Sequence, residues 1–223
     1  MDSQKISQNV NLGDAIALPP TKPIPIWRFV LPLLMQTVLI LTVPAQAVYT
    51  HLTGKTVILQ TIPVDPYSIL TGYSQSLTYN ISRQEDLKKL PGWEELVKKY
   101  PGSNKQHYPL AQGTNLYVIL QAESNTASIP KAWKPVRVSE KLPTSLAANQ
   151  IALQGSYRYG TVVYGLETYY IPEDQKEQIN KEISQIQQST TGEQQPIVVE
   201  VKVDARGKAV PISMWVRERN YRF

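Results

Sequence analysis

An uncharged apolar run at residues 29–49, FVLPLLMQTVLILTVPAQAVY, constrains this chain more than any other feature. At about 1.5 Å of rise per residue, a helix of this length crosses a hydrocarbon core of about 30 Å. Arg28 precedes the run, and Trp27 and Tyr49 lie at its two ends. A basic residue on the N-terminal side and aromatic residues at both ends are typical of a transmembrane helix whose N-terminus is cytoplasmic. We therefore expect residues 27–49 to anchor the chain in a membrane bilayer.

Two other interpretations of the apolar run stay open. Residues 43–47, VPAQA, have the small-x-small form of a signal peptidase site, and cleavage there would release a soluble periplasmic protein beginning at Val48. The polar side chains at positions 36, 37, 42 and 46 would instead suit a buried helix of a soluble fold. The region before the run is unusually long for a signal peptide, so we favour a retained anchor.

The chain divides into a tail, an anchor and one domain. Residues 1–26 are polar and interrupted by prolines, which predicts a disordered cytoplasmic tail. Residues 50–223 hold enough aliphatic and aromatic side chains for one domain of ordinary size. The expected orientation of the anchor places this domain in the bacterial periplasm or, in a photosynthetic cell, in the thylakoid lumen.

Composition excludes several classes of function. The chain has no cysteine, so disulfides, thiolate metal sites and cysteine nucleophiles are excluded. Tyrosine outnumbers phenylalanine 13 to 2, a mixture that suits half-buried strands in which the ring packs inward and the hydroxyl reaches polar surroundings. The net charge is +5, but the basic residues are dispersed along the chain, and we expect no nucleic-acid partner.

Alternating apolar residues predict antiparallel strands. The clearest pair covers residues 199–203 and 210–216, joined by a turn at 204–207, and Pro211 indicates an edge or bulged strand within it. The buried face of this hairpin is predicted to hold Val199, Val201, Val203, Val210, Ile212, Met214 and Val216. Further strands are predicted at 57–62, 74–79, 115–121, 136–142 and 151–159, with Tyr157 and Tyr159 sharing the buried face of the last.

Helical patterns are fewer. Residues 85–90 and 93–99 each predict a short helix, separated by the helix-breaking pair Pro91-Gly92. After Pro172 an amphipathic helix is predicted, with Ile179, Ile183 and Ile186 on its core face. Together the patterns predict an α+β fold, mainly antiparallel β with one amphipathic helix, preceded by a single N-terminal transmembrane helix.

Three stretches of the chain resemble one known family. Pro63-Val64-Asp65-Pro66, followed by Gly72, Leu77 and Tyr79, is similar to the signature of the GDYXXLXY family. Residues 164–173, YGLETYYIPE, and 201–210, VKVDARGKAV, are similar to two later family segments in the same order. The family comprises bacterial membrane-anchored proteins of unassigned function, so the resemblance implies a fold, an anchor and a topology but no reaction.

The signature departs from the family pattern at two positions. Tyr73 stands where the family has Asp, and Ser74 where it has Tyr, so no chemistry that depends on that acidic residue is expected here. The segment is rich in turn residues, and we predict that it projects near the membrane as a rigid surface for a partner. The predicted partner-binding residues are Pro63, Asp65, Pro66, Gly72, Leu77 and Tyr79.

No pattern in the sequence predicts catalysis. The segment 72–76, GYSQS, lacks the second glycine of a nucleophile elbow, and Pro130 interrupts the Ser-x-x-Lys spacing at Ser128 and Lys131. The two histidines are His51, at the membrane edge, and His107, in the 82–113 region, and both are predicted to be surface or interfacial residues rather than catalytic bases. We therefore expect no catalytic residue, no metal ion and no cofactor.

The sequence supports two hypotheses about function. The first is a non-enzymatic, membrane-anchored accessory module that docks on a polytopic membrane protein. The alternative is an extracytoplasmic hydrolase or carbohydrate-binding domain, in which tyrosine rings serve as stacking platforms. The candidate rings are those of Tyr157, Tyr159, Tyr169 and Tyr170.

Overall fold

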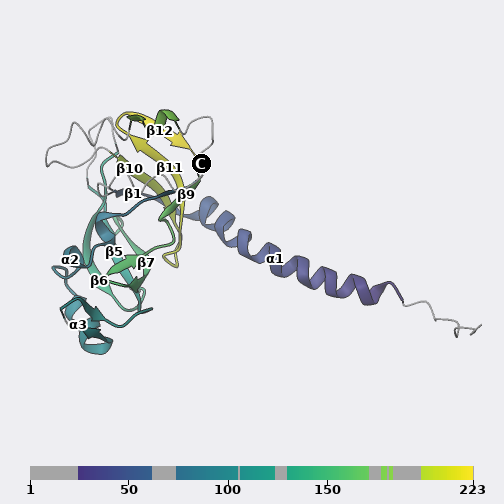
Figure 1. The fold of residues 1–223 in the computed structure, drawn as a ribbon, viewed down its shortest axis with the longest axis horizontal. Coiled ribbons are helices and arrows are strands. Elements are labelled where there is room, and N and C mark those ends of the chain that lie inside the picture. Colours follow the sequence, from purple (N-terminus) through teal and green to yellow (C-terminus); the bar gives the residue numbers. More distant parts are fainter. Residues whose placement is uncertain are drawn as a thin grey trace, which may run out of the picture. The chain divides into compact units, whose positions relative to one another are not determined.

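The computed structural model describes residues 25–61, 74–104, 106–123, 130–170, 177–179, 181–182 and 197–222. The chain divides into two units between Thr42 and Val43. Helix α1 (Trp27–Thr53) begins in the first unit and ends in the second (Figure 1, purple and blue). Nearly all of the predicted tail, residues 1–26, lies outside the described ranges.

Helix α1 carries the apolar run. Of the described helices, it is the one long and apolar enough to cross a membrane, and its large apolar side chains are exposed. The helix continues beyond Tyr49 and ends before Gly54, whose N–H donates a hydrogen bond to the carbonyl oxygen of Thr50 at 2.8 Å. A side chain at position 54 would approach that oxygen to 2.5 Å, so glycine permits the chain to turn directly into the first strand.

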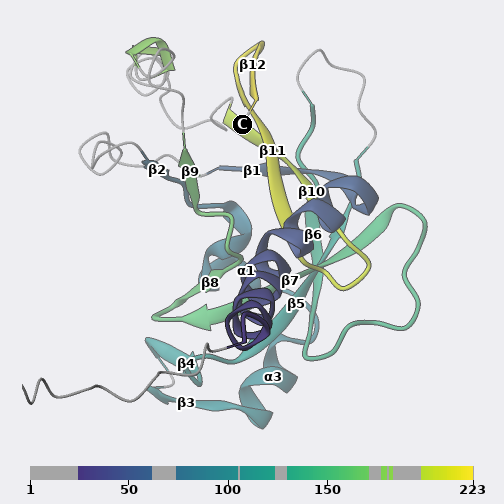
Figure 2. The same ribbon diagram turned by 90° about the vertical axis from the view of Figure 1, so that its right-hand side faces the viewer.

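The described strands form two larger antiparallel sheets and two small ones. The first larger sheet has the order β1-β10-β11-β12 and the second the order β6-β5-β7-β8. Figure 2 shows β10 and β11 in yellow beside the teal and green strands β5, β6 and β7. The small sheets pair β2 with β9 and β3 with β4. The strand bounds are β1 Lys55–Gln60, β2 Ser74–Ser76, β3 Pro101–Asn104, β4 Tyr108–Leu110, β5 Asn115–Gln121, β6 Lys134–Ser139, β7 Gln150–Arg158, β8 Thr161–Val163, β9 Thr168–Tyr170, β10 Ile197–Val203, β11 Ala209–Val216 and β12 Arg219–Arg222.

Short helices lie between β2 and β3. They are the 3-10 helix η2 (Asn80–Ser82) and the α-helices α2 (Gln84–Leu87) and α3 (Trp93–Lys99). The two short helices predicted in this region are present, although α2 ends before Leu90. Residues 177–179 and 181–182 are helical and Ile179 is fully buried, as predicted; Ile183 and Ile186 lie outside the described residues. The predicted class, mainly antiparallel β with few helices after an apolar N-terminal helix, is confirmed.

One hydrophobic core joins the two larger sheets. Val199, Val201 and Val203 of β10 are buried as their alternation predicts. In β11, however, the pairing with β10 shifts, because Glu200 lies opposite Ser213 while Val201 lies opposite Pro211. This bulge leaves an unpaired residue, so Met214 and Val216 are buried while Val210 and Ile212 are only half-buried, which corrects the prediction of one continuous face. The predicted bulge at Pro211 is present, and β11 is an interior strand.

Candidate functional site

The predicted partner-binding segment is described only at its C-terminal end. Leu77 and Tyr79 are buried, the Leu77 N–H donates to the carbonyl oxygen of Glu167 at 2.7 Å, and the Tyr79 hydroxyl donates to that of Leu166 at 2.7 Å. These two residues therefore fix the end of the segment to the core. Pro63, Asp65, Pro66 and Gly72 lie outside the described residues, and a partner surface at this segment stays a prediction.

A buried polar contact joins the end of α1 to the β10–β11 turn within the second unit. The hydroxyl of Thr50 donates to the Oδ2 atom of Asp204 at 2.9 Å, and both side chains are buried. The Oδ1 atom of Asp204 accepts the backbone N–H groups of Arg206 and Lys208, each at 2.9 Å. Because both carboxylate oxygens are used, the contact is a structural link with no free group for chemistry.

The same turn also touches the second sheet. The carbonyl oxygen of Gly207 accepts the N–H of Gln154 in β7 at 2.9 Å. Gly207 has a φ of +83°, and a Cβ atom there would lie 2.9 Å from the carbonyl oxygen of Ala152. The β10–β11 turn therefore contacts the end of α1 on one side, through Asp204, and β7 on the other, through Gly207. The sequence pattern predicts a turn at Asp204 but not its contact with Thr50, since no local pattern indicates a pair separated by 154 positions.

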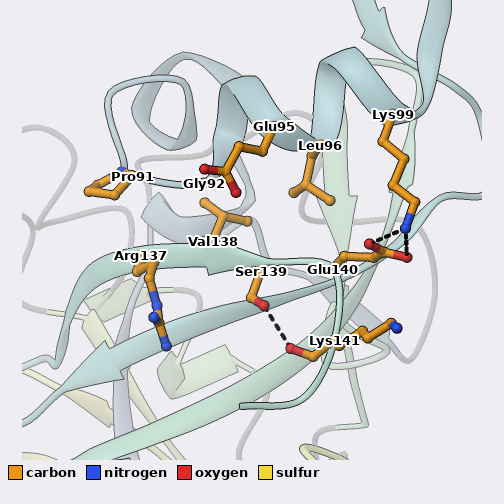
Figure 3. A pocket seen from close by; sticks show the side chains of 10 residues that line it. All are labelled: Pro91, Gly92, Glu95, Leu96, Lys99, Arg137, Val138, Ser139, Glu140 and Lys141. Atoms are coloured by element: carbon orange, nitrogen blue, oxygen red, sulfur yellow. Dashed lines mark hydrogen bonds and ion pairs between the residues drawn. The ribbon is translucent and has the colours of Figure 1, made fainter.

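A groove of about 510 Å³ lies between α3 and β6 (Figure 3). Figure 3 shows Lys99 of α3 reaching both carboxylate oxygens of Glu140, at 2.7 and 2.6 Å. The Tyr100 hydroxyl donates to the same carboxylate at 2.7 Å. Arg137 and Glu95 line the groove as well, so the groove holds both basic and acidic side chains. Such a lining is typical of a polar contact surface and does not concentrate one charge for an ionic ligand.

The ion pair in the groove shifts the pKa values of its members. Hydrogen bonds from Lys99 and Tyr100 lower the pKa of the Glu140 carboxyl below its ordinary value. The hydrogen bond to Glu140 raises the pKa of the Lys99 ammonium. Glu140 therefore adds stability above the pKa of an unfolded glutamate, and this contribution is lost as the pH falls through the lowered folded-state pKa.

Replacing Glu140 by glutamine is expected to reduce stability slightly at neutral pH and by less at acidic pH, because the contribution of the carboxylate is lost as the pH falls through its lowered folded-state pKa. The measurement is the melting temperature of both proteins at the two pH values. Glu95→Gln, which removes an acidic side chain of the same groove, is the matched control. An equal difference between Glu140→Gln and the original protein at both pH values would contradict the assignment.

The candidate stacking tyrosines separate into two environments. Tyr157 is fully buried, donates to the Oε1 atom of Gln84, and packs edge-on against Trp93 with ring centroids 6.3 Å apart. Tyr159 was predicted on the same face but is 79% exposed, because β7 ends at Arg158 and the chain turns there. The side chains of Tyr169 and Tyr170 lie outside the described residues.

A comparison with known families decides the membership of the chain. The sequence model described as GDYXXLXY protein matches residues 36–214, from within α1 to β11. The chain belongs to the GDYXXLXY family. No curated protein and no solved structure matches the chain. In this GDYXXLXY protein two of the three family stretches meet in the fold, since Leu77 and Tyr79 contact Glu167 and Leu166. Asp204 of the third stretch contacts the end of α1.

The described residues show no metal-binding cluster. Across the described ranges, no group of three or more His, Asp or Glu side chains lies close enough together to hold a metal ion. The expectations of no metal, no cofactor and no catalytic residue remain predictions.

Proposed function

We propose that this GDYXXLXY protein is a non-enzymatic accessory module that docks on a polytopic membrane protein. In this proposal α1 spans the bilayer, the N-terminus is cytoplasmic, and the β domain lies in the periplasm or thylakoid lumen. The observation that carries the proposal is the polar side chain of Gln36, which lies about 12 Å along the helix axis from Arg28 and therefore deep in the expected span.

The polar side chains of α1 differ in whether they have a hydrogen-bond partner within the helix. The hydroxyls of Thr37 and Thr42 donate to helix carbonyl oxygens, those of Leu33 at 2.8 Å and Leu39 at 2.6 Å. The carboxamide of Gln36 forms no hydrogen bond with any described residue. It presents two N–H donors and an acceptor oxygen that hydrocarbon cannot satisfy. Membrane helices place such groups against another helix, where a polar partner is available.

The surroundings of Gln36 fit a helix–helix contact. Leu33, Leu39 and Ile40 lie one turn away on the same side of the helix and are exposed apolar residues. A partner helix packed on this face would cover aliphatic side chains and meet one carboxamide at its centre. Gln46 lies within one turn of Tyr49, close enough to the expected interface for its carboxamide to reach water.

The domain supports the same proposal. Thr50 and Asp204 link the end of α1 to the domain, and Leu77 and Tyr79 fix the C-terminal end of the signature segment to the core.

Gln36→Leu is expected to lower recovery of the polytopic partner by roughly 3- to 30-fold, while Gln46→Leu leaves it within about twofold. The measurement is purification of the C-terminally tagged full-length protein from its native membrane in mild detergent, with intact-mass analysis of every retained protein. The original protein should carry a polytopic protein in fixed stoichiometry and keep its N-terminus. Recovery as a lone membrane protein, or as a soluble chain beginning at Val48, would overturn the proposal.

A further inference from the structure

The β7–β8 hairpin displays a tyrosine in a conformation that tyrosine disfavours. Arg158 pairs with Thr161, so Tyr159 and Gly160 form a two-residue turn in which their φ angles are +46° and +83°. Positive φ at both positions defines a turn that favours asparagine, aspartate or glycine at the first position. A residue with a bulky side chain loses stability there, and the ring of Tyr159 regains little by packing because it is 79% exposed.

The surrounding residues hold this turn in place. The N–H of Tyr159 donates to the Oε1 atom of Gln112 at 2.7 Å, and the Thr161 hydroxyl donates to the carbonyl oxygen of Arg158 at 2.9 Å. Thr161 also forms a bridge with Arg83. A disfavoured conformation fixed by its neighbours, with an exposed aromatic side chain at its tip, is typical of a residue retained for contact with a ligand.

An open cavity of about 400 Å³ lies beside the turn, within the size range of small-molecule sites. Tyr159 and the partly exposed Tyr108 contribute aromatic rings to its lining. Gln106 and His107 contribute an amide and an imidazole, groups that can both donate and accept hydrogen bonds.

Part of the cavity wall is already fixed. Gln84 is buried, accepts a hydrogen bond from the Tyr157 hydroxyl, and donates one to the carbonyl oxygen of His107 at 3.4 Å. Arg83 lies 3.9 Å from a carboxylate oxygen of Glu85 and 3.8 Å from one of Asp86. Lys88 also lines the cavity, so the charged lining groups are two cations and Glu85. Since Arg83 faces Asp86 as well, opposite charges lie close together and no unbalanced cluster of positive charge forms. The site therefore suits a neutral ligand with many hydroxyl groups better than a phosphate or a nucleotide.

We propose that the cavity beside the β7–β8 hairpin binds carbohydrate. A pyranose ring has an apolar face of C–H groups, which would stack on the ring of Tyr159, and an edge of hydroxyls, which would bond to Gln106 and His107. Binding at this cavity does not depend on Gln36 or on a membrane partner. The site thus adds a ligand-binding function to the proposed docking function.

The test is saturation-transfer NMR of the full-length protein with chitotriose and with maltotriose at millimolar concentration. The protein is held in a zwitterionic detergent, because a sugar-headed detergent would compete for the site. At least one trisaccharide should show transfer that Tyr159→Asn weakens by roughly tenfold, whereas Tyr159→Phe, which keeps the ring, changes it by less than about threefold. No transfer to either sugar, or equal transfer with Tyr159→Asn, would overturn the proposal.

The same variants separate ligand binding from a structural role. Tyr159→Asn places a favoured residue in the turn and is expected to raise the melting temperature of the domain by about 2–4 °C. Tyr159→Phe should leave the melting temperature unchanged, since the conformational penalty is the same for both aromatic residues. A variant that is more stable and yet binds sugar less well would show that tyrosine is kept for its ring; a less stable Tyr159→Asn would assign the ring a structural role and overturn the inference.

Discussion

Replacing Asp204 by alanine is expected to lower the free energy of unfolding of the β domain by about 2–4 kcal/mol. The substitution removes the acceptor of the buried Thr50 hydroxyl and of the backbone N–H groups of Arg206 and Lys208. Each buried donor left without a partner carries a desolvation cost of about 1–3 kcal/mol, although water can reach the N–H groups of the exposed turn residues. The measurement is urea unfolding of the full-length protein in detergent, with tryptophan fluorescence as the signal that monitors unfolding.

Two further variants test whether the loss comes from this contact. Asp204→Asn keeps an acceptor oxygen for the turn and an N–H for the Thr50 hydroxyl, so we expect it to cost about 1 kcal/mol. Thr50→Val removes only the hydroxyl that meets Asp204, and its effect should be non-additive with Asp204→Ala, because the two side chains share one interaction. If the Asp204→Ala protein lost less than about 0.5 kcal/mol, the junction would not stabilise the domain.

The elements that the sequence predicts best are those with local signals. The β10–β11 hairpin follows from alternating valines and an Asp-x-x-Gly turn, and β5 has the predicted bounds Asn115–Gln121. Strand β12 was missed because Arg217 and Glu218 interrupt any apolar pattern, and only the positive φ of Arg217 reverses the chain there. A short strand that pairs through such a turn has too few residues to show an alternating apolar pattern, so the sequence does not predict it.

The candidate sites depend on contacts that periodicity does not report. The 151–159 pattern placed Tyr159 with Tyr157 because alternation was extended through a turn, although the Tyr-Gly pair between two apolar runs is itself a hairpin signal. As one polar residue within an apolar run, Gln36 favours a buried helix of a soluble fold. In a membrane span, however, a carboxamide without a partner among the described residues indicates a partner helix. The link between Thr50 and Asp204 joins distant parts of the chain and requires the folded structure.

Replacing Gly92 by alanine is expected to cost about 2–5 kcal/mol of stability, and it tests how α3 is held against β6. Gly92 precedes α3 with a φ of +90°, a conformation that costs about 1–2 kcal/mol for a residue with a Cβ atom. The added Cβ atom would also lie 2.0 Å from the carbonyl oxygen of Val138, so the backbone must move apart. That movement would break the hydrogen bond from the Val138 N–H to the carbonyl oxygen of Pro91, which measures 2.9 Å, at a further cost of about 1–3 kcal/mol.

Gly113→Ala separates the two contributions. Gly113 has a φ of +78°, but no atom lies within 4 Å of the position where its Cβ would be placed. It should therefore show only the conformational cost of about 1–2 kcal/mol. Urea unfolding of both variants gives the comparison, and equal losses would show that the close approach of α3 to Val138 relaxes without cost. A larger loss for Gly92→Ala would mean that α3 and β6 cannot move apart without cost. The groove in Figure 3 would then have a fixed width, because Gly92 and Val138 hold its two walls in close contact.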